Sequence, residues 1–262
     1  MNHTMKKKSK HAQSTSRKLR RLTNALYDDN IQLIFIAGIP SCGKTKSVME
    51  AAAEQVFSGG SKYQKIVLCR PVIIPKTGFL PGSLEEKMKP YTKQAEIYMD
   101  KVLLPSDERF EIVSVDLLQG NRYQDCFVVF DEMQNIPWEE TFKVLSRRGE
   151  NSKYIIIGDM SMGQANTKVA PKDSMLYYAI QLFAKESYAS VHLFYDENDV
   201  LGDEITKKMI KKMLPDFVGD LDELKSLMND IEKDYLYEEE YDMPYTKCVA
   251  KKDKNHINYT KR

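Results

Sequence analysis

The chain of 262 residues lacks long apolar runs. The longest apolar candidates, Ile31–Gly38 and Phe127–Phe130, have the length of strands. A membrane span needs roughly 18 uncharged apolar residues. No apolar block follows the lysines near the amino terminus, so we expect no secretory signal. These absences argue against a membrane protein and predict a soluble, cytoplasmic one.

Closely spaced metal ligands are also missing. The four cysteines, Cys42, Cys69, Cys126 and Cys248, lie far apart without a CxxC pair, and the four histidines are scattered. Structural zinc ligands and disulfide frameworks show compact, regular spacings. The sequence therefore predicts neither a zinc site nor a disulfide framework.

Charge of one sign is nearly absent from two stretches. Residues 1–27 contain no acid, whereas their basic residues are Lys6, Lys7, Lys8, Lys10, Arg17, Lys18, Arg20 and Arg21. Residues 216–242 are strongly acidic, with Lys225 and Lys233 as the exceptions. Like-charge blocks are typical of solvated tails, and a basic arm also attracts phosphate backbones. We expect a basic arm over 1–27, a core over 28–215 and a charged tail over 216–262, helical and then disordered.

Between these stretches, short apolar runs alternate with segments of helical spacing. The expected strands are residues 31–37, 65–69, 111–115, 126–130, 154–157 and 191–194. The expected helices are residues 44–57, 83–104, a segment from about 137, 174–184, and a segment from 203 to about 236 interrupted at Pro215. Strands separated by helices are typical of parallel sheets covered on both faces. We therefore predict an α/β fold, a parallel sheet sandwiched by helices.

The strongest chemical signal follows the first expected strand. Its residues, Gly38-Ile39-Pro40-Ser41-Cys42-Gly43-Lys44-Thr45, match GxxxxGK[ST] in full. In such a phosphate loop (P-loop) the glycines let backbone N–H groups turn toward phosphate oxygens, and the next helix begins with its positive dipole end. Lys44 would contact the terminal phosphates, and the Thr45 hydroxyl would bind Mg²⁺. We predict that these residues and Lys46 bind a nucleotide.

Two acids end the fourth expected strand. Asp131 and Glu132 directly follow Phe127–Phe130. Asp131 would hold the Mg²⁺ ion, usually through water, and Glu132 is placed to activate the attacking water. A base beside the metal-binding acid favours ATP hydrolysis over small-molecule phosphorylation.

Two polar residues nearby are further catalytic candidates. Gln134 has two open interpretations: it senses the terminal phosphate, or it is a solvated loop residue. Asp159 follows the fifth expected strand after Gly158, so we expect it near the same water.

Together with three other stretches, these motifs resemble the PhoH family of P-loop ATPases, RecA-like relatives of superfamily-one helicases. The stretches are Arg70-Pro71, Gly78–Lys87 (GFLPGSLEEK), and Leu145–Gly149 (LSRRG) followed by Gly158-Asp159. The resemblance covers roughly residues 31–214. It implies a single P-loop ATPase domain that binds ATP and Mg²⁺ and acts on, or is stimulated by, RNA or single-stranded DNA. It also suggests a bacterial protein, or a phage protein in the host cytoplasm.

The chain departs from the family pattern at several places. Residues 119–122 (QGNR) stand where the family tends to have an Arg-Gly-Arg cluster, and the family's adenine-reading glutamine before the P-loop is not identifiable. The family's glutamine after the Gly-Asp pair corresponds to Met162, with Gln164 two residues later. Where the family tends to read D-x-V-R-S, the chain reads Asp199-Val200-Leu201-Gly202-Asp203, without the arginine. The alternative is therefore a nucleotide-dependent binding or assembly module with slow or absent hydrolysis.

A lone RecA-like core has half of a helicase's usual pair of lobes. The resemblance thus implies a homo-oligomer, for example a ring, in which subunits complete one another's sites. An arginine supplied by a neighbouring subunit is worth about 10³–10⁵ in rate where it exists. Arg147 is our candidate for a catalytic arginine, with Arg122 and Arg148 as substitutes.

Overall fold

The computed structural model describes residues 17–57, 61–71, 108–118, 121–161 and 169–217. Several expectations lie outside these residues. They are the helix over 83–104, the GFLPG segment, Gln164, residues 1–16 of the basic arm, and the tail beyond residue 217.

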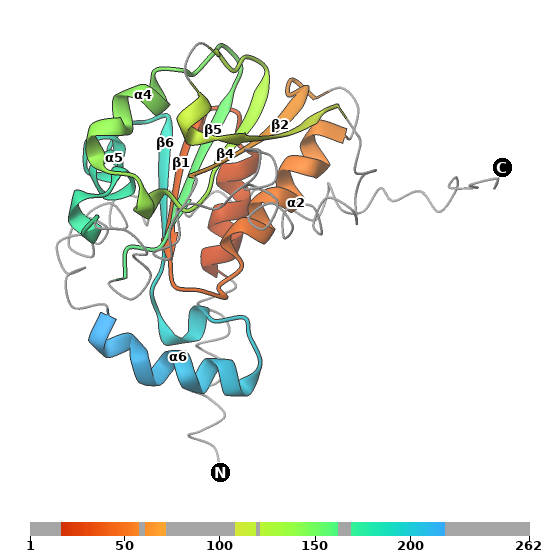
Figure 1. Ribbon diagram of the computed structural model, residues 1–262. Coiled ribbons are helices and arrows are strands. Elements are labelled where there is room, and N and C mark those ends of the chain that lie inside the picture. Colours follow the sequence, from red (N-terminus) through yellow and green to blue (C-terminus); the bar gives the residue numbers. More distant parts are fainter. Residues whose placement is uncertain (1–16, 58–60, 72–107, 119–120, 162–168, 218–262) are drawn as a thin grey trace, which may run out of the picture. The chain divides into compact units, whose positions relative to one another are not determined.

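Six parallel strands form one sheet (Figure 1). They are β1 (Leu33–Gly38), β2 (Lys65–Arg70), β3 (Phe110–Ser114), β4 (Cys126–Phe130), β5 (Lys153–Gly158) and β6 (Ala189–Phe194), in the order β3-β2-β4-β5-β1-β6. Every strand pair in this sheet is parallel, as predicted. All strands therefore end at the same edge, which we call the carboxyl edge; the opposite one is the amino edge.

Helices cover both faces of the sheet. One face carries the helix over residues 17–27 and α2 (Lys44–Phe57). The other carries α4 (Thr141–Leu145) and α5 (Met175–Phe183), whose Phe183 ring stacks on Phe35 (Figure 1). After β6 comes α6 (Glu204–Phe217). Short 3-10 turns lie at Val115–Leu117, Met133–Asn135, Trp138–Glu140, Pro171–Asp173 and Glu197–Asp199.

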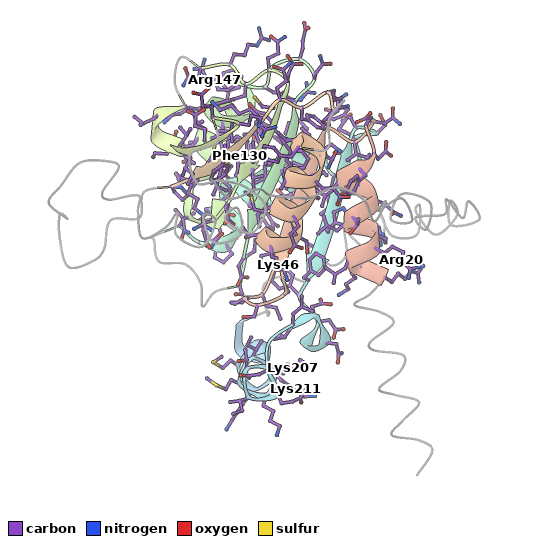
Figure 2. All side chains as sticks on the ribbon, turned by 90° about the vertical axis from the view of Figure 1, so that its right-hand side faces the viewer. Arg20, Lys46, Phe130, Arg147, Lys207 and Lys211 are labelled. Atoms are coloured by element: carbon purple, nitrogen blue, oxygen red, sulfur yellow. The ribbon has the colours of Figure 1, made fainter. Side chains whose placement is uncertain are left out.

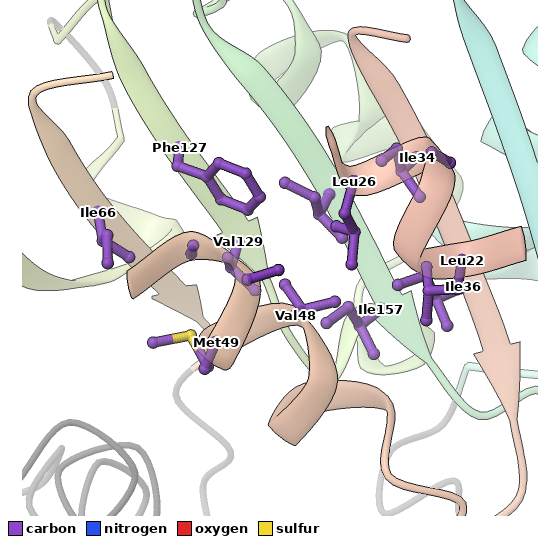
Figure 3. Packing of buried hydrophobic residues seen from close by; sticks show 14 of the residues in the cluster. Leu22, Leu26, Ile34, Ile36, Val48, Met49, Ile66, Phe127, Val129 and Ile157 are labelled. Atoms are coloured by element: carbon purple, nitrogen blue, oxygen red, sulfur yellow. The ribbon is translucent and has the colours of Figure 1, made fainter. Parts of the chain in front are cut away.

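The main hydrophobic core lies under α2 and the helix over residues 17–27 (Figure 3). Leu22 and Leu26 of that helix, together with Val48 of α2, meet strand residues such as Ile36 and Ile157. Each fully buried side chain of this size stabilises the fold by about 1.5–3 kcal/mol. Because both faces are covered, β1, β4 and β5 are buried along their whole length, as their continuous apolar sequences predict.

The expectation of a solvated arm over residues 1–27 is wrong for residues 17–27. Residues 17–27 are helical, and Leu22 and Leu26 are at most 1% exposed. The buried Lys153 ammonium donates to the carbonyl oxygens of Ala25, Leu26 and Asp28 at 3.0, 2.7 and 2.8 Å. The segment is an amphipathic helix, because leucines three and four positions apart share one face. Its many basic residues had favoured a solvated arm.

The interruption expected at Pro215 is also wrong. α6 continues through Pro215 to Phe217, so the expected core boundary falls inside a helix. Proline removes one backbone hydrogen bond, and α6 ends two residues after it. Within the described ranges, none of the helices has the length and apolar character needed to cross a membrane.

Candidate nucleotide site

The loop between β1 and α2 has the shape of a phosphate cradle. Ser41 and Gly43 adopt left-handed backbone conformations, with φ of 62° and 83°, which curl the chain. The Lys44 ammonium donates to the carbonyl oxygens of Gly38 at 2.6 Å and Ile39 at 2.8 Å, so its charge lies inside the curl. α2 begins at Lys44 and turns its N-terminus to the same place. The loop thus offers N–H donors and positive charge to phosphate oxygens.

The other loop residues divide into buried and exposed ones. Ile39 and Cys42 are each 1% exposed, and burial raises the pKa of the Cys42 thiol, which keeps it protonated. Pro40 and Ser41 are exposed. Lys46 is exposed too, and its ammonium lies 3.8 Å from the carboxylate of Glu50, one turn along α2 (Figure 2).

Thr45 and Asp131 face each other across the end of the sheet. The Thr45 hydroxyl lies 3.3 Å from both carboxylate oxygens of Asp131, which is buried. Hydroxyl and carboxylate oxygens are the ligands that Mg²⁺ prefers, so these two residues fit the ion. When bound, Mg²⁺ would neutralise phosphate charge. Among the described residues, no cluster of three His, Cys, Asp or Glu side chains provides another metal site.

Arg70 is a site residue that the sequence analysis did not nominate. Its Nε donates to Asp131 Oδ2 at 3.1 Å, and its Nη2 makes a second contact with the same oxygen. A signal was available, because Arg70 and Asp131 both come at the end of an apolar run. The sequence alone did not reveal that β2 pairs with β4, with Cys69 opposite Phe130, and this pairing brings Arg70 to Asp131.

Glu132 is held beside Asp131 by its backbone and by a hydrogen bond from Gln134. Its φ of 64° is left-handed, and its N–H donates to Asp131 Oδ1 at 3.1 Å. The Gln134 amide donates to Glu132 Oε2 at 2.7 Å. Burial, followed by the charge of Asp131, raises the pKa of Glu132, and the Gln134 hydrogen bond offsets part of this effect. A raised pKa makes the carboxylate a stronger base.

Gln134 joins Glu132 to Asp159. The Gln134 Oε1 atom accepts a hydrogen bond from the Asp159 N–H at 3.1 Å, and Gln134 is 3% exposed, so it is not a solvated loop residue. Burial raises the pKa of Asp159. Asp159 Oδ1 accepts from the Ser161 N–H, whereas Oδ2 is buried without a hydrogen bond of good geometry among the described residues, although Tyr195 lies nearby. Glu132, Gln134 and Asp159 thus form one connected group.

Arg147 is not brought to this site. Its carbonyl accepts from the N–H of Tyr123, a residue that precedes β4, and this contact places Arg147 at the amino edge (Figure 2). Arg122 and Arg148 lie there too, since Arg122 Nε donates to the Arg148 carbonyl at 3.4 Å. The phosphate loop occupies the carboxyl edge, so none of these arginines reaches the site of its own chain.

Comparison with known proteins identifies the family. The family model described as PhoH-like protein matches residues 11–214. The chain belongs to the PhoH family. Its parallel sheet flanked by helices is consistent with an α/β P-loop NTPase fold.

Three relatives show the extent of the similarity. Protein PhoH of Escherichia coli (strain K12) is 29% identical over 180 residues, covering 64% of this chain and 49% of that protein. A PhoH-like protein of Mycobacterium leprae is 33% identical over 138 residues, covering 49% of this chain and 39% of that protein. A PhoH-like protein of Bacillus subtilis is 30% identical over 188 residues, covering 68% and 57%. The chain spans about half the length of the curated relatives it matches.

Proposed function

We propose that this PhoH-like chain is a Mg²⁺-dependent ATPase coupled to RNA or single-stranded DNA. The observation that carries the proposal is the position of Glu132. Its N–H is bonded to Asp131, its carboxylate accepts from Gln134, and its raised pKa suits a general base.

Each residue has a defined role in hydrolysis. Residues 38–46 bind the phosphates, and Thr45 and Asp131 hold Mg²⁺. Glu132 removes a proton from the water that attacks the terminal phosphorus, while the bond to the bridging oxygen of ADP breaks. Lys44 stabilises the charge on the phosphate oxygens. Gln134 and Asp159 hold Glu132 and the water in line.

Arg147 enters this scheme only through a second subunit. An arginine at the amino edge of one chain contacts ATP at the carboxyl edge of a neighbouring chain if subunits stack head to tail. A closed ring satisfies this arrangement. Arg147, Arg122 and Arg148 are the arginines that such a neighbour would offer.

Nucleic acid is the partner that the charge pattern favours. The lysines of α6 (Lys207, Lys208, Lys211 and Lys212) are exposed or half-buried, and residues 1–27 carry no acid. Basic side chains bind phosphate backbones with little regard to sequence. The same pattern suits a protein that works in the cytoplasm, where RNA and single-stranded DNA are available.

A second candidate is a nucleotide-dependent binding or assembly module with slow hydrolysis. The observation that favours it is the location of the arginines. Among the described residues, Arg70 is bonded to Asp131, whereas Arg147 lies at the amino edge. A chain without a neighbour would then bind ATP and hydrolyse it slowly.

Phosphate release from ATP and Mg²⁺, measured with and without single-stranded RNA or DNA, tests the proposal. We expect release to increase with nucleic acid. We expect Glu132→Gln to lower kcat by about 10²–10⁴-fold because the base is removed. Binding of ATP by this variant, followed by calorimetry, should remain.

The matched control is Glu150→Gln, which changes an exposed acid at the amino edge. It should hydrolyse ATP like the unmodified protein. Nucleotide binding without turnover above the Glu132→Gln level would instead support the binding module. Turnover unaffected by nucleic acid would remove the coupling and leave the ATPase.

A further inference from the structure

The phosphate loop has two different flanks in the plane of the sheet. β1 lies between β5 and β6. On the β5 side stand the groups that would act on phosphate: Asp131 and Glu132 after β4, and Asp159 after β5. On the β6 side stands the segment of residues 195–202, which we call the β6 flank.

The position of the acids sets the direction of a bound nucleotide. Hydrolysis takes place at the terminal phosphate, so that end of the triphosphate must point toward Glu132 and the Thr45–Asp131 pair. The nucleoside end must then leave the loop on the opposite side, toward the β6 flank. This step rests on the proposed function.

The β6 flank is fixed directly to the phosphate loop. The Leu201 N–H donates to the Ser41 carbonyl at 2.8 Å, and at the end of β6, directly before the flank, the Phe194 carbonyl accepts from the Ile39 N–H at 2.9 Å. A Cβ atom added to Gly38 would lie 2.6 Å from Phe194 Cβ, which shows how closely the two segments approach. The flank therefore keeps a set position beside the loop.

Lys18 holds the flank from its other side. Its ammonium donates to Asp199 Oδ2 at 2.7 Å, and Asp199 is 1% exposed. The same carboxylate oxygen accepts from the Asp196 N–H at 2.9 Å, inside the turn that leads to Leu201. Because the Asp199 carboxylate is buried, this pair is shielded from salt more than a surface ion pair.

Leu201 presents an apolar surface next to the phosphate loop. A Cβ atom added to Gly43 would lie 2.8 Å from Leu201 Cδ1, so the leucine side chain packs against the loop. The residue is nevertheless 53% exposed. The exposed part of this leucine side chain, at the nucleoside end of the phosphate loop, can contact the flat face of a base.

We propose that Leu201 forms the base-side wall of the nucleotide site, with the Lys18–Asp199 pair as the element that positions it. An apolar wall holds a base by contact and leaves the hydrogen-bonding edge of the base unread. Leu201 therefore contributes to nucleoside affinity and adds nothing to the binding of phosphates alone.

Two ligands separate these contributions. Calorimetry would measure the affinity of the full chain for ATP and for inorganic tripolyphosphate, both with Mg²⁺. We expect Leu201→Ala to weaken ATP binding by about tenfold and to leave tripolyphosphate binding unchanged. Leu201→Met, which restores an apolar side chain of similar volume, should recover most of the ATP affinity.

The matched control is Leu182→Ala on α5, because Leu182 is 50% exposed and lies on the other face of the sheet. It should change neither affinity. An unchanged ratio of ATP to tripolyphosphate affinity in Leu201→Ala would overturn the inference and leave the proposed ATPase standing. An unmodified chain that binds neither ligand would overturn both.

Discussion

The two edges of the sheet use polar side chains differently. At the carboxyl edge, two acidic side chains are bonded to other side chains, in the contacts of Arg70 with Asp131 and of Gln134 with Glu132. At the amino edge, Lys153 and Arg148 bond to the backbone. Lys153 donates to three carbonyl oxygens, and Arg148 Nη2 donates to the Ser152 carbonyl at 3.0 Å. Backbone bonds fix the fold, whereas paired side chains can exchange partners with a ligand.

Two cavities in the described part of the chain do not coincide with the candidate functional site. They measure about 330 and 340 Å³ and share Gln32 and Arg148, at the amino edge. The Arg148 guanidinium is already bonded to Gln32 and Ser152 there. The residues that suit catalysis lie instead where strands end, which is where α/β sheets place their ligands.

Of the three variants that test this comparison, Lys44→Ala at the carboxyl edge is expected to lose the most activity. Removing this ammonium should lower kcat by about 10²–10³-fold, because a preorganised charge at the terminal phosphates disappears. Phosphate release checks this. The control is Lys62→Ala, whose ammonium pairs with Asp29 and lines one of the amino-edge cavities. Equal losses in both variants would contradict the division between the edges.

An intermediate effect is expected from Lys153→Met at the amino edge. The carbonyl oxygens of Ala25, Leu26 and Asp28 would lose their donor, and we expect about 2 kcal/mol less free energy of unfolding. Urea denaturation measures this, and ATP affinity of the folded variant should remain. Lost ATP affinity with unchanged stability would show that the amino edge takes part in nucleotide binding.

The smallest change in rate, about tenfold in kcat, is expected from Gln134→Leu. The Gln134 hydrogen bond favours ionised Glu132, so the variant should raise the pKa of that carboxylate further. Activity needs the ionised base and should fall as the pH drops through this pKa. The acid limb of kcat/KM should lie above the ordinary glutamate value of 4.5 in the unmodified chain, and higher still in the variant. A limb that moves to lower pH would contradict the role of Gln134.

Much of the fold could be predicted because its strands are continuous apolar runs between recognisable signals. The bounds of α2 and β4 agree with the expectation to the residue. The helix over residues 17–27 was missed because its charges concealed the spacing of Leu22 and Leu26. The shift in charge near Pro215 likewise suggested a boundary that α6 crosses.

The site was predictable where neighbouring residues in sequence make it, and not where distant segments meet. The phosphate loop and the Asp131-Glu132 pair are local motifs. The contact of Arg70 with Asp131 depends on which strands pair, and that of Leu201 with Gly43 on how the chain returns after β6. Arg147 looked catalytic from its motif, yet the sheet places it at the far edge.

Glu132 has a left-handed backbone, so a substitution that stabilises the fold at this position can also remove the proposed catalytic base. A residue with a Cβ atom gives up about 1–2 kcal/mol in this conformation, which asparagine adopts more readily. Glu132→Asn would therefore relieve strain and also remove the base. Engineering this chain for heat resistance alone would select such a change, and its product would hold ATP without cleaving it. Under the proposed mechanism, this variant would accumulate in the nucleotide-bound form.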